Sequence, residues 1–227
     1  MDSGLVSSTL HCAAVLFDLD GVLVDSTAAV EAVWTAFARR HGLDAAGLME
    51  DLHGRRMADI LRSALPGLTE AGLAREAALL EDAEVEGASD AVAIPGATGL
   101  TASMRDSLWA IVTSGTVPVA MARIGAVGLA RPPVLVTADD VTAGKPSPEP
   151  YLLAAERLGV EPRRCVVIED APSGLRAGRA AGAVTIGVTT SHPPEHLGDA
   201  DHVVASVGAI ERVSAPDHAE IRLRFKR

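Results

Sequence analysis

Aromatic residues and cysteines are scarce in this chain. Aromatic residues account for 3% of its 227 residues, so the apolar 48% of the chain must build a core mainly from alanine, valine and leucine. The two cysteines, Cys12 and Cys165, each lie beside a buried-strand pattern. Two scattered cysteines form neither a disulfide scaffold nor a metal knuckle, so we expect buried, reduced thiols.

The chain also lacks a surplus of positive charge and a long hydrophobic run. It has 20 basic against 30 acidic residues, which gives a formal charge of −10. Nucleic-acid-binding proteins normally present a basic face that displaces phosphate counterions, so we expect no nucleic-acid partner. Residues 1–10 have neither a basic start nor a long apolar stretch, which argues against a signal peptide or membrane anchor. We therefore expect a soluble, cytoplasmic protein with no membrane partner.

Short β-branched apolar runs alternate with helical patterns through most of the chain. Helical periodicity covers Pro148–Leu158 and Ser173–Ala181. This alternation predicts an α/β fold with a parallel sheet and flanking helices. The five expected strands are Val15–Phe17, Ala110–Thr113, Val134–Val136, Val166–Ile168 and Val184–Val188.

Between residues 26 and 94 the pattern changes to almost unbroken helix. Apolar residues recur at three- and four-residue spacing in Ala28–Arg40, Met57–Ala64 and Glu70–Glu86. We therefore divide the chain into an α/β core of residues 1–25 and 95–227 and a helical lobe of residues 26–94. The lobe's acidic cluster is expected to form a solvated helix face, although one or two of its members could meet polyol hydroxyls. The cluster comprises Glu81, Asp82, Glu84 and Glu86.

Two carboxylates follow the first expected strand of the core. In the run Phe17-Asp18-Leu19-Asp20-Gly21, Asp18 and Asp20 share one face at strand spacing. Two acids held that close raise each other's pKa unless a cation or a proton lies between them. Alone, such a run could be a turn with solvated acids. Together with the segments below, it indicates a metal-assisted nucleophile.

Three later segments place chemistry-bearing residues after other strands. Thr113-Ser114-Gly115 offers a hydroxyl and free backbone N–H groups to an anion. Lys145 lies in Gly144-Lys145-Pro146-Ser147-Pro148, where two prolines stiffen the loop and so fix the direction of the ammonium. Glu169 and Asp170 end another strand. Ligands of doubly wound sheets bind at the carboxyl ends of the strands, so these four segments predict one site.

These four motifs, in this order, resemble those of the haloacid dehalogenase superfamily, specifically its phosphatase and phosphomutase branch. The resemblance runs from about Val15 to about Val204 and implies a Rossmann-like core with an inserted, mobile helical cap. It also implies a phosphoric monoester hydrolase that uses Mg²⁺. The expected substrate is a small phosphorylated sugar or polyol, and the expected state is a monomer or small homo-oligomer.

The resemblance assigns roles to the four acids. Asp18 would be the nucleophile that forms an aspartyl phosphate, and Asp20 the general acid and base. Hard oxygen ligands select Mg²⁺. The ion would be bound by the carboxylates of Asp18 and Asp170 and by the backbone carbonyl of Asp20. Glu169 would either be a further ligand or hold the ligands in place without contacting the ion.

The phosphoryl oxygens would be held by Thr113 and Lys145, together with the backbone N–H groups of Ser114 and Gly115. Specificity is expected to reside in the cap, where His53-Gly54-Arg55-Arg56 stands between two helices. Arginines suit polar or anionic ligands. Otherwise this segment, and His53 in particular, is a solvated helix start.

Two rival functions remain open. A β-phosphoglucomutase shares the four motifs but also uses a cap histidine; the corresponding place here is Val30, and no histidine lies between Cys12 and His41. That departure favours net hydrolysis. A receiver-like phosphoacceptor module also has a parallel sheet with clustered acids, but it lacks a helical insertion of this size and would show no turnover. The tail from Asp217 to Arg227 is expected to be either an added edge strand or packing arm, or a frayed basic end.

Overall fold

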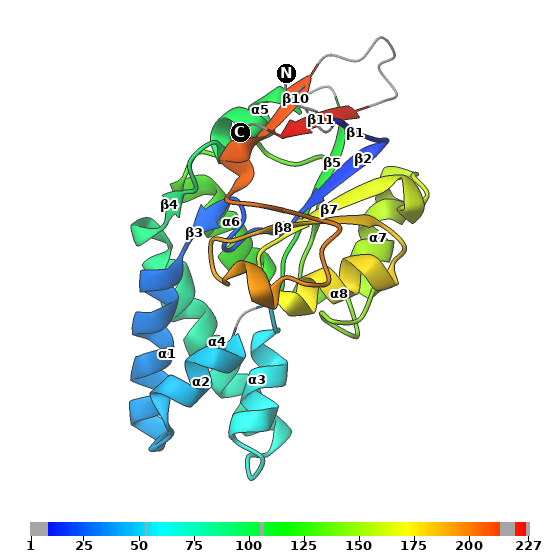
Figure 1. Cartoon of the computed structure of the whole chain (residues 1–227). Helices are drawn as coiled ribbons and strands as arrows, with labels where there is room; N and C mark the ends of the chain where they lie inside the picture. The colour runs from blue at the N-terminus through cyan, green and yellow to red at the C-terminus, as the bar shows by residue number, and fades with distance from the viewer. Residues whose placement is uncertain (1–8, 53, 105–106, 214–220, 226–227) are drawn as a thin grey trace.

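A parallel sheet of six strands forms the centre of the molecule (Figure 1). The computed structural model describes residues 9–52, 54–104, 107–213 and 221–225. Every pair of neighbouring strands in the sheet is parallel. In spatial order, the strands are β6 (Val134–Val136), β5 (Leu108–Val112), β2 (Ala14–Phe17), β7 (Cys165–Glu169), β8 (Val184–Val188) and β9 (His202–Val204).

Helices cover both faces of this sheet, as the alternating pattern predicts. On one face, Val15 and Phe17 pack in a core with α5 (Ala97–Ser103) and α6 (Val117–Ala126). On the other, Ala14 and Leu16 pack against α7 (Glu149–Leu158) and α8 (Pro172–Ala180). Side chains alternate between the faces of a strand, so β2 is buried on both sides. The few aromatics are concentrated in buried places: Phe17 meets Trp109 edge to face at 6.0 Å between ring centroids.

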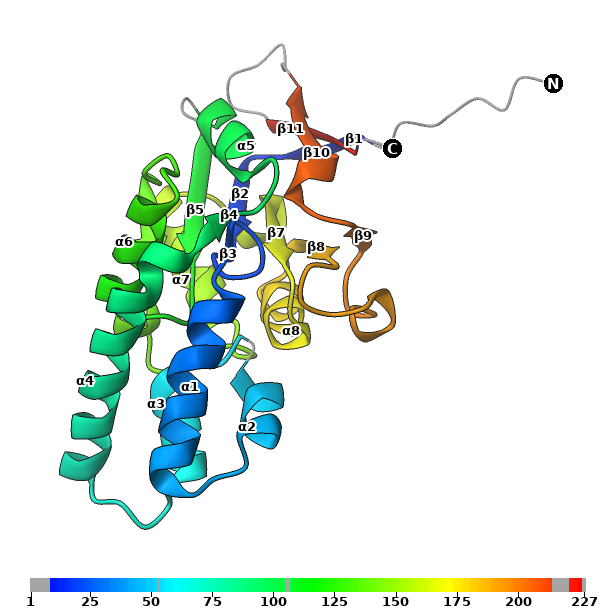
Figure 2. The same ribbon diagram turned by 90° about the vertical axis from the view of Figure 1, so that its left-hand side faces the viewer.

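Four helices stand together at one end of the sheet (Figures 1 and 2), and we call them the cap. They are α1 (Thr27–His41), α2 (Ala45–Leu52), α3 (Met57–Ala64) and α4 (Glu70–Gly87). They share a small apolar core of Trp34, Phe37, Ile60, Leu61 and Leu80. A short antiparallel pair, β3 (Val24–Asp25) with β4 (Val92–Ala93), joins the cap to the sheet.

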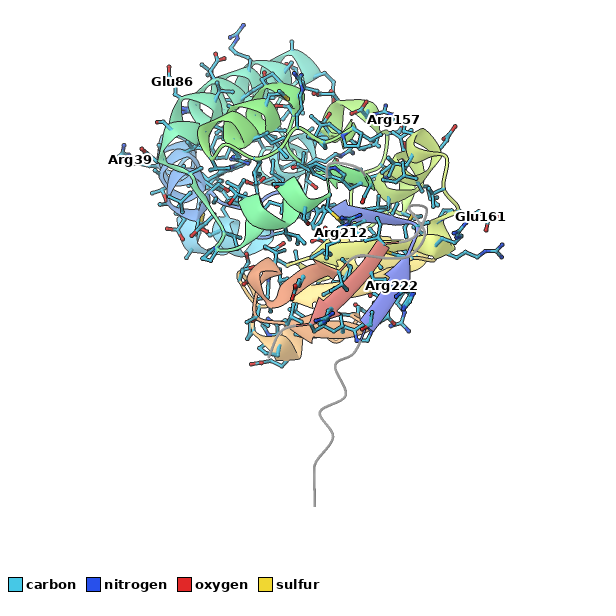
Figure 3. The ribbon with its side chains drawn as sticks, turned by 90° about the horizontal axis from the view of Figure 1, so that it is seen from above. Arg39, Glu86, Arg157, Glu161, Arg212 and Arg222 are labelled. Carbon is cyan, nitrogen blue, oxygen red and sulfur yellow. The ribbon has the colours of Figure 1, made fainter. Side chains whose placement is uncertain are left out.

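The two ends of the chain meet in a separate antiparallel sheet at the end of the molecule away from the cap (Figure 1). Its strands are β1 (Thr9–Cys12), β10 (Ile210–Val213) and, between them, β11 (Ile221–Phe225). Figure 3 looks down on this sheet and labels Arg212 and Arg222, which lie on it. Arg39 and Glu86, which lie on cap helices, appear at the edge of the same view. The edge strand expected in the tail is wrong in its position: residues 221–225 form the central strand of this sheet, paired on both sides. The rest of the tail lies outside the described residues.

No helix in the described part of the chain combines the length and the apolar character needed to cross a bilayer.

Candidate active site

The four predicted motifs converge at the carboxyl ends of three neighbouring strands. Asp18 directly follows β2, Thr113 follows β5, and Glu169 ends β7 with Asp170 next to it. Because β5, β2 and β7 are adjacent and parallel, their ends lie at one edge of the sheet. Lys145 reaches the same edge from the loop between β6 and α7.

Lys145 is a buried cation surrounded by acceptors. Its ammonium contacts an oxygen of the Asp18 carboxylate, lies 2.6 Å from Glu169 Oε1 and donates to the Val112 carbonyl at 3.1 Å. Burial lowers the pKa of Lys145, but the charges of Asp18 and Glu169 outweigh burial and raise it. The ammonium is therefore charged, and it places a buried positive charge directly beside Asp18.

Both carboxylate oxygens of Glu169 accept hydrogen bonds from other groups of this chain. Oε1 accepts a hydrogen bond from the Tyr151 hydroxyl at 2.7 Å, and Oε2 accepts from the Asp170 and Ala171 backbone N–H groups at 3.2 and 3.4 Å. The carboxylate packs so tightly against the first turn of α8 that a β-carbon at Gly174 would collide with it. These contacts suit a residue that holds Lys145 and the β7 loop in place.

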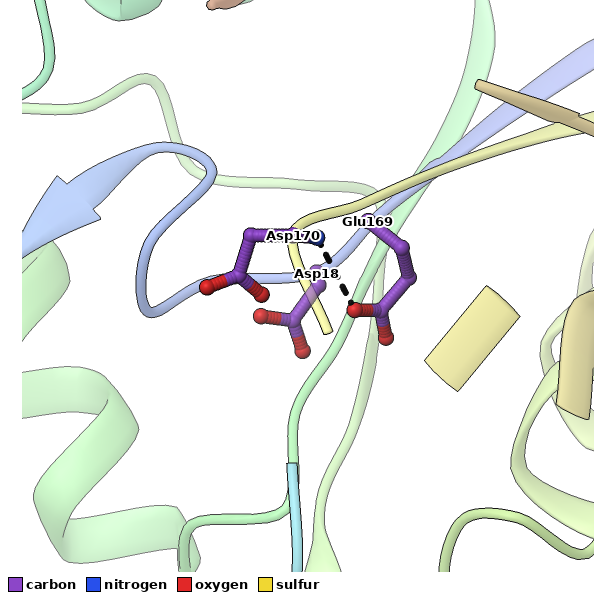
Figure 4. Close-up of side chains that lie close together, drawn as sticks. All are labelled: Asp18, Glu169 and Asp170. Carbon is purple, nitrogen blue, oxygen red and sulfur yellow. Dashed lines mark hydrogen bonds between the residues drawn. The ribbon is translucent and has the colours of Figure 1, made fainter. Parts of the chain in front are cut away.

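Three carboxylates lie close together here, and two of them contact Lys145. Oxygens of Asp18, Glu169 and Asp170 lie within 4.8 Å of one another, with the Asp18 carboxylate between the other two (Figure 4). Burial raises the pKa of Asp18 well above its usual range although Lys145 opposes the shift. Burial and then Glu169 raise the pKa of Asp170 to about 7. A divalent cation would relieve this excess of negative charge, and hard carboxylate oxygens are suitable ligands for Mg²⁺, so the residues present fit the metal.

The loop after β2 closes over these acids. Gly21 has a φ of +81°, a conformation that glycine adopts without strain, and a β-carbon there would collide with the Asp170 carboxylate. The close approach of this loop explains why a glycine follows the two aspartates.

Of the anion-binding groups predicted after β5, the Thr113 hydroxyl keeps its hydrogen available, whereas the Gly115 N–H already donates within the segment. Thr113 Oγ1 accepts a hydrogen bond from the Gly115 N–H at 3.0 Å, so its own hydrogen remains available for another acceptor. The Ser114 hydroxyl instead donates to the Gly54 carbonyl of the cap at 2.8 Å. All three residues line a cavity of about 150 Å³, which Asp18 and Asp170 also line.

The cavity lies between cap and core, and the cap supplies much of its wall. Its apolar lining residues include Val30, Trp34, Met49, Leu52, Met57 and Ile60. Thr116 also lines it, and the Thr116 hydroxyl oxygen is buried without a hydrogen-bond partner among the described residues.

The two cap arginines, Arg55 and Arg56, have different surroundings. Arg55 lines the cavity and donates to the Ser63 hydroxyl at 3.2 Å. Arg56 pairs with Asp59 at 2.8 Å and donates to the Val141 carbonyl at 3.0 Å, so it links the cap to the core loop before Lys145. His53 lies outside the described residues.

Asp20 has two partners that sequence reasoning missed. Its Oδ1 accepts from the Ser26 hydroxyl at 2.7 Å, and its Oδ2 accepts from Arg123 at 2.9 Å. Arg123 also donates to Glu84 at 2.9 Å. The solvated face expected for the acidic cluster of α4 is therefore wrong at Glu84, which is buried, whereas Asp82 and Glu86 are exposed. The sequence did carry one signal for this missed contact: Arg123 is the only charged residue in the otherwise apolar segment 117–126.

Comparison with known proteins identifies the family. The sequence profile of the haloacid dehalogenase-like hydrolases matches residues 12–182. Hexitol phosphatase A of Escherichia coli is 42% identical over 210 residues, which cover 92% of this chain and 97% of that protein. 2-Deoxyglucose-6-phosphate phosphatase 2 of Saccharomyces cerevisiae is 34% identical over 219 residues, 87% of this chain and 89% of that protein.

A solved structure agrees with the sequence relatives. A hydrolase from Pseudomonas syringae superimposes with a TM-score of 0.78 at 27% identity, covering 86% of this chain and 94% of that one. The protein is thus a hydrolase with a parallel-sheet core. More particularly, the chain belongs to the haloacid dehalogenase-like hydrolase family and is a phosphatase of that family, as its four motifs predict.

Proposed function

We propose that this protein is a Mg²⁺-dependent phosphatase that hydrolyses a small sugar or polyol phosphate through an aspartyl phosphate on Asp18. The observation that carries the proposal is the position of Asp18: its carboxylate lies beside the Lys145 ammonium and near Asp170, and it lines the cavity under the cap. The names of the relatives, a hexitol phosphatase and a 2-deoxyglucose-6-phosphate phosphatase, support a sugar or polyol ester.

In the first step, an Asp18 oxygen attacks phosphorus while the P–O bond to the alcohol breaks. Asp20, whose side chain is 30% exposed, gives its proton to the leaving oxygen. The Thr113 hydroxyl and the Lys145 ammonium hold the phosphoryl oxygens and stabilise their charge. In the second step, Asp20 takes a proton from water, whose oxygen attacks phosphorus. Inorganic phosphate leaves, and Asp18 is regenerated.

Asp18 and Asp170 would hold the Mg²⁺, joined by the Asp20 backbone carbonyl. When bound, the cation neutralises negative charge on the phosphoryl group and on the acids. Glu169 is the weaker candidate ligand, because both of its oxygens already accept hydrogen bonds from this chain. We assign it to holding Lys145.

The rival functions give different products. A phosphomutase would convert one phosphorylated sugar into an isomer without releasing phosphate, and a receiver-like module would turn over nothing. Val30 lines the cavity at the place where a mutase would carry its cap histidine, which supports hydrolysis. We expect phosphate release from at least one member of a panel of phosphorylated sugars, polyols and glycolate with Mg²⁺. Isomer formation without phosphate release, or no turnover of any ester, would refute the proposal.

Removal of the metal should abolish phosphatase activity. We expect exhaustive chelation, with the metal content verified, to abolish phosphate release and Mg²⁺ to restore it. Mg²⁺ should also raise the melting temperature of the chelated protein, because a ligand that binds only the folded state stabilises it. Asp170→Asn removes one proposed ligand and should weaken both responses. Full activity in the metal-free protein would defeat the ligand assignment.

The two cap arginines should respond differently to substitution. We expect Arg55→Ala to raise KM or lower kcat/KM for the preferred ester, because Arg55 belongs to the cap part of the cavity wall, where the proposed mechanism places the leaving group. A small aryl phosphate should be affected less. Arg56→Ala is the matched control: it removes contacts to Asp59 and Val141 and should change the two esters alike. Unchanged kinetics of Arg55→Ala on the preferred ester would place specificity elsewhere in the cap.

A further inference from the structure

Arg123 is a buried cation that connects Asp20 of the core to the cap. It lies on α6, and its side chain is 5% exposed. Nη1 donates to Asp20 Oδ2 and Nη2 donates to Glu84 Oε2, each at 2.9 Å. Glu84 lies near the end of α4, and its other oxygen accepts a hydrogen bond from Trp34 Nε1 at 2.9 Å. The four side chains therefore form a continuous series from the catalytic loop to α4 and α1.

The cap side of this series fixes the guanidinium. Helices α4 and α6 pack against each other, and Glu84 is itself held by the indole of Trp34. The guanidinium is planar, with its donors in a rigid fork, so anchoring Nη2 on Glu84 also sets the direction of Nη1. Nη1 points at Asp20. The position of the Asp20 carboxylate is then determined by Arg123 on one oxygen and by Ser26 on the other.

Helix packing alone does not require this arrangement. Placing an arginine and a glutamate between two packed helices carries a desolvation cost, and an apolar pair of similar volume would stabilise the contact as well or better. Burial raises the pKa of Glu84 even though Arg123 opposes that shift, which reflects this cost. The pair is therefore better explained by what Arg123 does to Asp20 than by what it adds to stability.

We propose that Arg123 is a positioning residue that fixes the Asp20 side chain at the wall of the cavity, where the leaving oxygen would lie, with Glu84 holding Arg123 in turn. The inference rests on the proposed role of Asp20 as the general acid. Arg123 exchanges no proton: the proton moves from Asp20 to the leaving oxygen as the P–O bond breaks. Loss of Arg123 should therefore damage the reaction in proportion to how much the leaving group needs that proton.

Two aryl esters of similar size test this dependence. Phenol is a weaker acid than 4-nitrophenol, so phenyl phosphate needs the proton more. We expect Arg123→Met to lower kcat/KM for phenyl phosphate by roughly 10- to 100-fold, part of the ~10²–10⁴-fold that positioned proton transfer contributes. The loss for 4-nitrophenyl phosphate should be about threefold or less. The ratio kcat/KM reports the first step only, so hydrolysis of the phosphoenzyme does not blur the comparison.

Three further variants serve as comparisons and controls. Arg123→Lys preserves the charge, but an ammonium cannot bind both carboxylates with the fixed geometry of a guanidinium. We therefore expect kcat/KM to fall less than in Arg123→Met, with the same preference for the better leaving group. It also provides the measurement if Arg123→Met fails to fold. In an Asp20→Asn background, Arg123→Met should add less than about threefold, because the two side chains act through one proton transfer. Arg40→Met removes an exposed cap ion pair with Glu76 and should leave both esters unaffected.

The outcomes separate this inference from the proposed function. A wild-type enzyme that is active but whose Arg123 variants lose the same factor on both esters, or lose nothing, would overturn the positioning role and leave the phosphatase proposal standing. A full additive loss in the Asp20→Asn background would also overturn it. A wild-type protein that hydrolyses no ester would instead refute the proposed function itself.

Discussion

Asp18→Asn is expected to reduce turnover to below about 1% of the wild-type rate while the fold persists. Asparagine has nearly the same shape, and its amide oxygen can still accept from Lys145, but it is a poor nucleophile. Phosphate release from the preferred ester measures the loss, and circular dichroism with thermal unfolding checks the fold. Retained hydrolysis above that level would remove Asp18 from the nucleophile role.

The same variant tests the covalent intermediate. Wild-type protein quenched in acid during turnover should carry a phosphoryl group that hydroxylamine releases, because acyl phosphates react with that nucleophile. Asp18→Asn should carry none. Asp139→Asn is a matched control, since Asp139 accepts from the Val117 N–H and lies in the short 3-10 helix Ala138–Asp140, away from the three clustered carboxylates. A phosphoryl group on Asp18→Asn would point to another acceptor.

Five of the six strands of the core sheet could be predicted, because a buried strand appears in the sequence as a short run of apolar, β-branched residues. The edge strand β9 was missed, because it is short and only partly buried. Val134–Val136 and Val184–Val188 appear as β6 and β8 with the expected bounds, and no end of β2, β5 or β7 differs from its expected position by more than two residues. The convergence of Asp18, Lys145, Glu169 and Asp170 follows from the same pattern. Parallel strands present their carboxyl ends at one edge, so residues after successive buried runs are brought together.

The contacts of the cap with the core could not be predicted in the same way. Acids at positions 81, 82, 84 and 86 lie on one helix, and nothing local shows which of them faces α6. Arg123 is separated by 103 residues from Asp20 and by 39 from Glu84, so their meeting depends on how the cap sits on the sheet. Likewise, Arg56 carries a charge that suits an anion, yet its neighbours in space are Asp59 and Val141.

The small terminal sheet shows the same limit. Alternation of Ile221, Leu223 and Phe225 indicates a strand with one buried face. Its partners come from opposite ends of the chain: Leu223 lies across from Leu10 of β1 and from Arg212 of β10. The alternation predicts the strand but not these pairings, and so could not show that β11 lies in the middle of its sheet.

Lys145→Met should damage both stability and catalysis. The substitution leaves the buried carboxylates of Asp18 and Glu169 without their cation, and removal of one partner from a buried ion pair costs about 3–5 kcal/mol of the free energy of unfolding. That loss lowers the melting temperature by roughly 6–20 °C in a chain of this size. Arg157→Met is the control: it removes a partly exposed pair with Asp140 and should cost no more than about 1 kcal/mol.

The catalytic loss should be separable from the loss of stability. Lys145 holds phosphoryl oxygens in the proposed mechanism, so kcat/KM should fall by roughly 10²-fold or more at a temperature where the variant remains folded. The double variant Asp18→Asn/Lys145→Met should be more stable than Lys145→Met alone, because one of the two stranded carboxylates is then neutral. If the double variant were instead less stable by the sum of the single effects, Asp18 and Lys145 would be energetically independent. The stabilising partner of Lys145 would then be Glu169 alone, with Asp18 held in place by the loop after β2.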